Sequence, residues 1–183
     1  MRALLAAPAR CRAGNPALHA LRGGGGVKRL GYGLAAGVFL LDQAVKYWII
    51  SVLGLQAKVS VPVLPFFSLT WVENYGVSMG MFQADSGVER WGLTLLTAGI
   101  AAFVGAWIAR EKAMPEVIAL GLVLGGAVGN ILDRVRFGYV VDFVHLHIGN
   151  WSFYVFNVAD AAISIGVALL LVRALLAPKE SKA

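Results

Sequence analysis

Charged side chains are scarce in this chain of 183 residues. Asp, Glu, Lys and Arg together make up 14% of it, whereas a soluble domain carries roughly 25%. Hydrophobic residues account for 58%, and the mean hydropathy is +0.73. Because so few polar side chains cannot solvate the outside of a globule, the composition predicts a membrane protein.

Cysteine is almost absent as well. Cys11 is the only one, which excludes an intrachain disulfide and any CxxC metal or redox site. An HExxH zinc motif, a GxSxG nucleophile motif and a glycine-rich phosphate loop are all missing. These absences argue against a zinc peptidase of that type, a serine hydrolase and a P-loop enzyme.

Histidine is rare too, and only His145 and His147 lie beyond the N-terminal segment. Two imidazoles spaced two residues apart on a strand face the same way, which is one arrangement for a metal site. The alternation of a surface strand explains the pair equally well. We therefore predict no metal and no cofactor. Any enzymatic activity of the chain is then expected to resist the chelator EDTA.

Four segments are long and apolar enough to cross a membrane, since a helical span needs about 20 largely apolar residues. Trp91 and Trp107 lie near the two ends of the second segment, at the levels of the membrane interfaces. Pro115 opens the third, where proline is tolerated. We predict helices over Leu30–Leu53, Trp91–Ile108, Pro115–Leu132 and Asn157–Leu176.

The two ends of the chain are predicted to lie outside this membrane domain. Residues 1–26 are rich in Ala, Arg and Gly and end in four glycines. Their apolar stretch Ala3–Ala7 is shorter than the roughly 7–15 residues of a signal-peptide core. We expect a disordered cytoplasmic tail over 1–26, a membrane domain over 27–177, and a second cytoplasmic tail over 178–183.

Basic residues are unevenly distributed among the predicted connections. If the N-terminus is cytoplasmic, eleven Lys and Arg lie on the inside and four on the outside. This bias satisfies the positive-inside rule and places both termini inside the cell. The net charge of +6 then follows from topology, and no nucleic-acid partner is needed to explain it.

Two stretches then lie on the outer side. Within residues 56–88, Val59, Val61 and Val63 alternate, and a second alternating run extends from Phe67 to Glu73. A period of two predicts short strands lying on the membrane surface. Residues 134–156 form an outer loop with another partly alternating run and a Gly149-Asn150 turn signal.

The polar residues of the predicted helices gather at one level. Polar groups inside a bilayer are costly, so each is a functional hypothesis. The cytoplasmic halves of the first, third and fourth helices are almost purely apolar, which predicts a site near the outer surface. The polar set consists of Asp42, Lys46, Asn130, Asp133, Arg134, Asn157 and Asp160, with Asp142 in the outer loop between the last two helices.

The spacing of some of these residues leaves two interpretations open. Asp42 and Lys46 are four apart with the acid first, the favourable order for a helical ion pair. Such a pair can be structural or functional. Gly121, Gly125 and Gly129 recur every four residues, which favours close packing of the third helix against a neighbour.

Two of the acids support the most specific chemical hypothesis. If Asn157 caps the fourth helix, Asp160 lies in its first turn, where backbone donors and the helix dipole favour a carboxylate. Alone, it could be a capping acid. A second carboxylate such as Asp142 changes this, because two carboxyls sharing a site hold one proton between them. Such a pair can deprotonate a water and protonate a leaving amine, hydrolysing a peptide without a metal or a covalent intermediate.

Five short motifs follow one another between Leu30 and Leu176. They read DQAVK from Asp42, ENYG from Glu73, GGAVGNILDR from Gly125, VDF from Val141 and FNVAD from Phe156. This set resembles the DQxxK, Asn-x-Gly, GGAxGNxxDR, VxDF and FNxAD elements of the lipoprotein signal peptidase (signal peptidase II) family. One such motif is weak evidence, whereas five in the same order are highly specific.

The resemblance implies a fold and an activity. The fold class is an all-α membrane protein with four transmembrane helices, a small extracytoplasmic β-cradle and an outer loop or helix. The activity is that of an aspartic endopeptidase that removes signal peptides from bacterial prolipoproteins, cutting before the cysteine that carries diacylglycerol. The family's catalytic aspartates correspond to Asp142 and Asp160. Its supporting residues correspond to Asp42, Lys46, Asn74, Gly76, Asn130, Asp133, Arg134 and Asn157.

The resemblance also implies surroundings and partners. It places the chain in the bacterial cytoplasmic membrane, in contact with membrane lipids and with the active site near the outer face. It also implies that the cyclic peptide globomycin inhibits the enzyme. We predict a monomer. After Asn74 the chain reads Gly76-Val77-Ser78-Met79, where the family usually has Gly-Ala-Ala-Phe. The larger Val77 is expected to alter the substrate groove and the inhibitor contacts, but not the carboxylate pair.

Two other classes of protein remain open from the residues alone. A proton-coupled carrier or channel could use Asp42, Lys46 and Asp133 as a relay, but the apolar cytoplasmic half offers no polar path. A membrane scaffold packed through its glycines would leave the carboxylate cluster unexplained.

Overall fold

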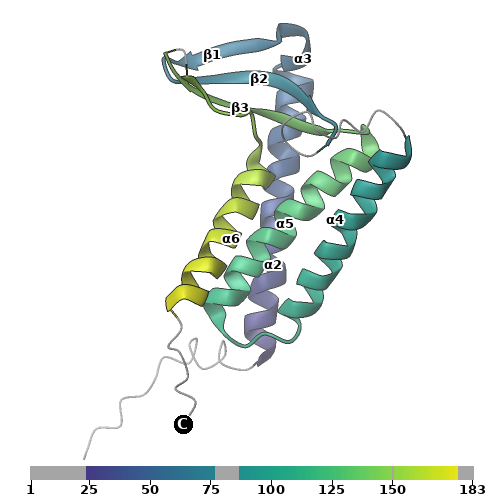
Figure 1. The fold of residues 1–183 in the computed structure, drawn as a ribbon, viewed down its shortest axis with the longest axis vertical. Helices are drawn as coiled ribbons and strands as arrows, with labels where there is room; N and C mark the ends of the chain where they lie inside the picture. The colour runs from purple at the N-terminus through teal and green to yellow at the C-terminus, as the bar shows by residue number, and fades with distance from the viewer. Residues whose placement is uncertain (1–23, 77–86, 150, 177–183) are drawn as a thin grey trace, which may run out of the picture.

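Four long helices and a small sheet make up the structure, a computed structural model that describes residues 24–76, 87–149 and 151–176 (Figure 1). All four helices are long and apolar enough to span a membrane. The helices are α2 (Gly24–Tyr47, continued by the π-helical turn η1, Trp48–Val52), the short α3 (Leu55–Lys58), α4 (Gly87–Ile108), α5 (Met114–Arg136) and α6 (Val158–Leu176). The strands are β1 (Ser60–Leu64), β2 (Phe67–Asn74), β3 (Val140–Ile148) and β4 (Trp151–Ser152).

Helix α5 lies at the centre of the bundle and packs against α2, α4 and α6. Its glycines allow backbones to approach closely: a β-carbon on Gly125 would lie 2.5 Å from the carbonyl oxygen of Ala35 on α2. Gly121 makes the same kind of approach to Gly31, also on α2. The predicted glycine face is confirmed as a packing face. At Gly129 the space is taken instead by the carboxylate of Asp42, 2.6 Å from where a β-carbon would lie.

The sheet covers one end of the bundle, here called the sheet end (Figure 1). Its strand order is β1-β2-β3-β4 with antiparallel neighbours, so the strands predicted from the alternating runs are present. The alternation buries Val141 and Phe143 of β3 against Ile49 of η1 and Leu55 of α3. This contact fixes β3 across the sheet end of α2.

Asp142 lies within strand β3, in the connection between α5 and α6 where the sequence places it, and the partly alternating run noted there forms this strand. The expected outer loop over 134–156 is largely regular, because α5 continues through Asp133 and Arg134 to Arg136 before β3 begins. Helix α5 ends where Gly138 adopts a φ of +88° and donates its N–H to the carbonyl of Arg134, a helix-ending geometry that favours glycine. The Gly149-Asn150 turn signal lies between β3 and β4; Gly149 has a φ of +57°, and Asn150 lies outside the described residues.

Helix α2 begins at Gly24, six residues before the predicted start at Leu30. Gly24–Gly26 therefore belong to the helix and not to the predicted tail. The extension is stabilised because Val27 is buried against Val104 and Ile108 of α4. The rest of the predicted N-terminal tail, the predicted C-terminal tail over 178–183, and the Val77-Ser78-Met79 departure lie outside the described residues.

Candidate active site

A buried ion cluster lies where α2 and α5 meet near the sheet end. The Lys46 ammonium is 2.9 Å from Asp42 Oδ2 and 2.6 Å from Asp133 Oδ2. Side-chain exposure is 2% for Lys46 and 0% for both acids. Lys46 also donates to Asn130 Oδ1 at 3.3 Å, which satisfies its three N–H groups. The helical pair predicted from the spacing is thus part of a three-residue cluster.

This ion cluster also binds the backbone of the two elements that carry Asp142 and Asp160. Asp42 Oδ1 accepts from the N–H of Ala159 in the first turn of α6 at 3.0 Å. Asp133 Oδ2 accepts from the N–H of Val141 in β3 at 3.2 Å. The two acids of the cluster therefore fix the residues immediately before Asp160 and Asp142 in the sequence.

Gln43 belongs to the same cluster, although the candidate site residues did not include it. Its amide donates to Asp133 Oδ1 and to Asp42 Oδ2, each at 3.1 Å. The sequence did contain a signal, because Gln43 is the second residue of the DQxxK motif. A polar residue next to Asp42 on an apolar helix is a functional hypothesis by itself.

Asp160 is held at the start of α6 by reciprocal hydrogen bonds with Asn157. The N–H of Asp160 donates to Asn157 Oδ1 at 2.9 Å, and the N–H of Asn157 donates to Asp160 Oδ2 at 3.3 Å. This is a capping-box geometry, and it confirms Asn157 as the predicted cap of this helix. Asn130 donates to the other oxygen, Oδ1, at 2.8 Å. Asp160 is half-buried, so water can reach it.

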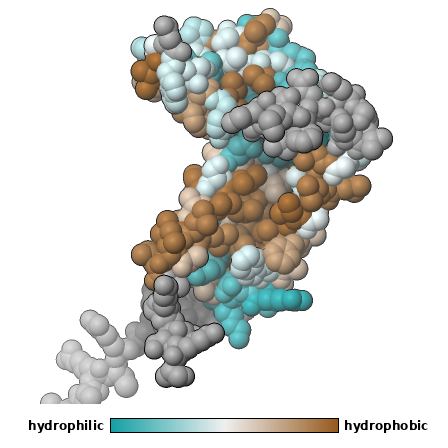
Figure 2. Space-filling model, in the orientation of Figure 1, coloured by the Kyte–Doolittle hydropathy of each residue, from teal (hydrophilic) through white to brown (hydrophobic). Residues whose placement is uncertain are grey.

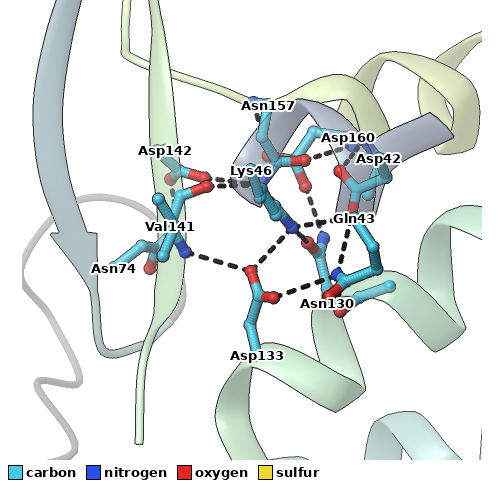
Figure 3. Close-up of polar contacts among 12 residues, drawn as sticks. Asp42, Gln43, Lys46, Asn74, Asn130, Asp133, Val141, Asp142, Asn157 and Asp160 are labelled. Atoms are coloured by element: carbon cyan, nitrogen blue, oxygen red, sulfur yellow. Dashed lines mark hydrogen bonds and ion pairs between the residues drawn. The ribbon is translucent and has the colours of Figure 1, made fainter. Parts of the chain in front are cut away.

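Asp142 is buried and accepts two amide hydrogen bonds. Asn157 Nδ2 donates to its Oδ1 at 2.6 Å, and Asn74 Nδ2 donates to its Oδ2 at 3.0 Å. Figure 3 shows Asp142 pointing from its strand toward Asn157 and the first turn of α6. Burial, and then the negative charge of Asp160, raise the pKa of Asp142 to about 7. Near neutral pH the carboxyl group of Asp142 is therefore partly protonated.

Gly76 and Arg134 complete the predicted set in different ways. The N–H of Gly76 donates to Asn74 Oδ1 at 3.2 Å, so the amide that faces Asp142 is itself oriented. Arg134 is within electrostatic range of Asp160 and Asp142. Its Nε is buried and has no hydrogen-bond partner within the part of the chain that the structure describes. Nine of the ten predicted residues thus share one hydrogen-bonded network, which Arg134 adjoins. Figure 3 labels all the members of this network except Gly76.

The two histidines lie apart from this network. His145 bonds Thr70 at 3.2 Å and Ser152 at 2.5 Å, and His147 bonds Ser68 at 2.9 Å. None of these three partners belongs to the network around Asp142 and Asp160. Over residues 24–76, 87–149 and 151–176, no group of three or more His, Cys, Asp and Glu is arranged to hold a metal ion.

Comparison with known proteins identifies the family. The family model described as signal peptidase (SPase) II matches residues 34–176. A lipoprotein signal peptidase of Rhizorhabdus wittichii is 59% identical over 148 residues, covering 80% of this chain and 86% of the relative. A lipoprotein signal peptidase of Sphingopyxis alaskensis is 55% identical over 150 residues, covering 81% and 86%.

Two solved structures share the architecture. Both are described as structures of a bacterial membrane enzyme. One is 28% identical, with a TM-score of 0.71, covering 84% of this chain and 93% of the other. The second is 29% identical, with a TM-score of 0.70, covering 81% and 94%. With the family model spanning all four helices and the sheet, the chain belongs to the signal peptidase II family of membrane-embedded aspartic peptidases.

Proposed function

We propose that Asp142 and Asp160 are the catalytic acids with which this signal peptidase II removes signal peptides from lipid-modified prolipoproteins, cutting before the lipidated cysteine. The observation that carries the assignment is Asn157, which donates its side-chain amide to Asp142 and its backbone N–H to Asp160. The relatives named lipoprotein signal peptidase supply the substrate class. Membership of the family decides between this activity and the carrier or scaffold that the residues alone left open.

The chemistry follows from one proton shared between two carboxyl groups. The ionised carboxylate takes a proton from a water, whose oxygen attacks the scissile carbonyl carbon while the protonated acid donates a hydrogen bond to the carbonyl oxygen. As the tetrahedral intermediate collapses, the C–N bond breaks, and a proton passes to the leaving nitrogen, the amino group of the cysteine. With its pKa raised to about 7, Asp142 supplies the protonated acid in a large share of the molecules at neutral pH.

The supporting residues hold this pair in place and do not react. Lys46 forms ion pairs with both Asp42 and Asp133, and these two acids bind the backbone beside each catalytic residue. The remaining amides, Asn74, Asn130 and Asn157, donate to the catalytic carboxylates. Preorganised donors of this kind do not have to reorient during the reaction.

The location of the site suits a substrate held in the bilayer by its acyl chains. We place both termini in the cytoplasm of a bacterial cell and the sheet end at the outer face of the cytoplasmic membrane, on the bias of Lys and Arg. In this orientation the carboxylate pair lies at the outer interface. There it meets the end of a transmembrane signal peptide and a cysteine whose diacylglyceryl group stays in the lipid. The substrate and the bilayer lipids are the only partners the reaction needs, and a monomer suffices.

Mass spectrometry of a lipidated model precursor incubated with the purified protein tests the activity. The expected product is a signal peptide ending immediately before the modified cysteine. A globomycin-type peptide should block its release, and EDTA should not. Loss of cleavage on chelation, restored by zinc, would contradict the aspartic mechanism, and a cut elsewhere in the precursor would contradict the substrate assignment.

A further inference from the structure

Asn74, which donates to Asp142, is the last residue of strand β2. Its backbone pairs with Val140 in β3, and its side-chain amide lies 3.0 Å from Asp142 Oδ2. The end of a strand frays unless further contacts hold it. The side chains of its two neighbours in the sequence, Glu73 and Tyr75, make such contacts, although neither is among the predicted site residues.

A short hydrogen bond joins these two neighbours. The hydroxyl of Tyr75 donates to Glu73 Oε2 at 2.6 Å. This bond is the main reason that the pKa of Glu73 lies below its ordinary value, so the carboxylate is ionised at neutral pH. The distance is typical of a charge-assisted hydrogen bond, which is about twice as strong as a neutral one. Because the two residues flank Asn74, their bond restricts the backbone that carries it.

A strong bond is needed at this location. Figure 2 shows a mixed hydrophilic and hydrophobic surface at the sheet end, above the hydrophobic surface of the helices. Tyr75 is 44% exposed, so water competes for its hydroxyl. A neutral hydrogen bond contributes little at such a site, because water replaces either partner. The ionised acceptor on Glu73 makes the bond persistent.

Further contacts connect the two residues to the rest of the sheet end. Glu73 Oε1 accepts from Trp71 Nε1 at 3.3 Å and from Gln56 of α3 at 3.4 Å. The ring of Tyr75 packs against the ring of Tyr139, with centroids 5.3 Å apart. Tyr139 is the residue immediately before β3. The contacts therefore tie the end of β2 to the start of β3.

Asn74 acts on Asp142 by a hydrogen bond and not by a charge. After burial, the charges of Asp160 in α6 and, in the opposite sense, Lys46 in α2 act on the pKa of Asp142. Arg134 of α5 is also within electrostatic range of Asp142. The hydrogen bond from Asn74 stabilises the ionised carboxylate and so lowers its pKa. An amide that is held less firmly leaves the pKa of Asp142 higher.

We propose that Glu73 and Tyr75 are positioning residues for the cleavage reaction, and that the hydrogen bond between them holds Asn74 where it donates to Asp142. This inference rests on the proposed function, because it requires Asp142 to be a catalytic acid. Glu73 and Tyr75 do not react in this scheme. They act only through the amide of the residue between them.

Removal of one hydroxyl tests the proposal. Tyr75→Phe keeps the ring that packs against Tyr139 but loses the bond to Glu73. We expect kcat for a lipidated precursor to fall by about 10-fold to 100-fold, because small misplacements near a reacting group have effects of this size, while KM stays unchanged. The alkaline limb of the kcat/KM profile should move to higher pH, since Asp142 loses a hydrogen bond that lowers its pKa.

Variants of the acceptor give the matching result. Glu73→Leu removes the acceptor and should reproduce the loss of kcat and the displaced pH profile of Tyr75→Phe. Glu73→Gln keeps an amide oxygen that accepts from the Tyr75 hydroxyl, so it should retain most of the wild-type rate. A loss in Glu73→Gln as large as that in Glu73→Leu would overturn the proposal.

A double-mutant cycle separates positioning from a general loss of structure. In an Asn74→Ala background, Tyr75→Phe should change kcat by less than about twofold, because the residue through which it acts is gone. Equal losses from Tyr75→Phe in the two backgrounds, or a pH profile that does not move, would overturn the proposal. Ser60→Ala is the matched control: it removes an exposed hydrogen bond of the same sheet, to Thr70, and should leave kcat unchanged.

Failure of this inference is distinguishable from failure of the proposed function. If Asp142→Asn is inactive while Tyr75→Phe cleaves at the wild-type rate, the proposed function stands and the positioning role is wrong. If Asp142→Asn cleaves at the wild-type rate, the proposed function is wrong and this inference falls with it. The melting temperature of Tyr75→Phe in detergent should stay close to that of the wild type. A loss of kcat that follows a loss of melting temperature would assign Tyr75 a structural role and overturn the proposal.

Discussion

The ion cluster and the carboxylate pair are both built from acids at the sheet end of the bundle, but their surroundings differ. Asp42 and Asp133 share one lysine, and their oxygens accept from backbone and amide N–H groups. Asp142 and Asp160 accept hydrogen bonds from neutral amides, and neither takes part in an ion pair within the described residues. Acids in direct contact with a lysine are suited to hold a structure together, whereas buried acids that have no direct ion-pair partner are better suited to retain a titratable proton. The comparison distinguishes the acids that we propose support the site, Asp42 and Asp133, from the acids that we propose catalyse the reaction, Asp142 and Asp160.

The largest expected effect is the loss of one acid of the pair. Asp142→Asn or Asp160→Asn keeps the shape of the side chain but removes its ability to hold or transfer the proton. Cleavage of lipidated precursor should fall by about 10²–10⁴-fold, while the melting temperature in detergent stays close to that of the wild type or rises. Turnover at the wild-type rate by either variant would reassign the chemistry.

Loss of the lysine should act on stability first. Lys46→Met leaves two buried acids without their countercharge, and breaking a buried ion pair costs about 3–5 kcal/mol. The free energy of unfolding in detergent should fall accordingly. Arg173→Met is the matched control, because it breaks the half-exposed pair with Glu116 at the other end of the bundle, where about 0–1 kcal/mol is expected. Equal losses in the two variants would remove the distinction between the two regions.

The pH dependence should reveal the acid that lacks a countercharge. The pKa of Asp142 is raised to about 7, so the singly protonated pair is lost as the pH rises through that value. We expect kcat/KM to fall by about tenfold per pH unit above pH 8, with precursor binding unchanged. Activity that is flat from pH 6 to pH 9 would contradict this.

The same raised pKa makes a prediction about stability. The folded protein keeps a proton on Asp142 that the unfolded chain releases near pH 4, so the folded state binds more protons in the window between about 4 and 7. Stability from this group is therefore present at low pH and is lost as the pH rises through 7. Comparing melting temperatures of wild type and Asp142→Asn at pH 5 and pH 8 checks the sign, since only the wild type should lose stability through this group.

A smaller effect is expected from the glycine against the ion cluster. In Gly129→Ala the new β-carbon would lie 2.6 Å from Asp42 Oδ2, so the acid or the helix must shift. Overpacking of this kind costs about 1–3 kcal/mol. Gly105→Ala on α4 is the control, because its β-carbon would meet only Leu124, at 4.0 Å. Gly129→Ala should lower the free energy of unfolding more than Gly105→Ala does.

The smallest effect is expected from the histidines. His145 and His147 bond Ser68, Thr70 and Ser152, and none of these contacts the carboxylate pair. The rate of cleavage by His145→Gln and His147→Gln should therefore stay within about twofold of the wild type. A large loss of cleavage rate in either variant would indicate that a histidine takes part in the reaction and would reopen the metal hypothesis.

Much of the fold follows from patterns with a simple physical basis. Apolar length predicts the spans, period-two alternation predicts β1 and β2, and recurrent glycines predict the α5 packing face. The gathering of polar residues at one end of the apolar helices predicts the location of the candidate site. What the sequence could not provide is the tertiary pairing: Asp133 could not be assigned to Lys46, nor Asn74 to Asp142, because these contacts join elements far apart in the chain.

Local sequence patterns also do not predict where the helices begin and end. The start of α2 at Gly24 depends on the packing of Val27 against α4. The continuation of α5 through Asp133 depends on the ion pair of Asp133 with Lys46 of α2. Both are tertiary effects that override the preference of glycine and of charged residues to end a membrane span. The extent of strand β3 likewise depends on tertiary pairing, since β2 and the chain around Phe156 pair with it.

The hydrogen bonds of Asn157 couple two kinds of order. Because its side chain both caps α6 and donates to Asp142, the start of a transmembrane helix and the alignment of the proposed catalytic pair depend on the same few atoms. Since a helix that does not match the bilayer thickness tilts or bends, we expect a membrane too thin or too thick for α6 to shift Asn157 relative to Asp142. Turnover should therefore pass through an optimum in bilayers of graded acyl-chain length, which makes the thickness of the host membrane a control on the enzyme.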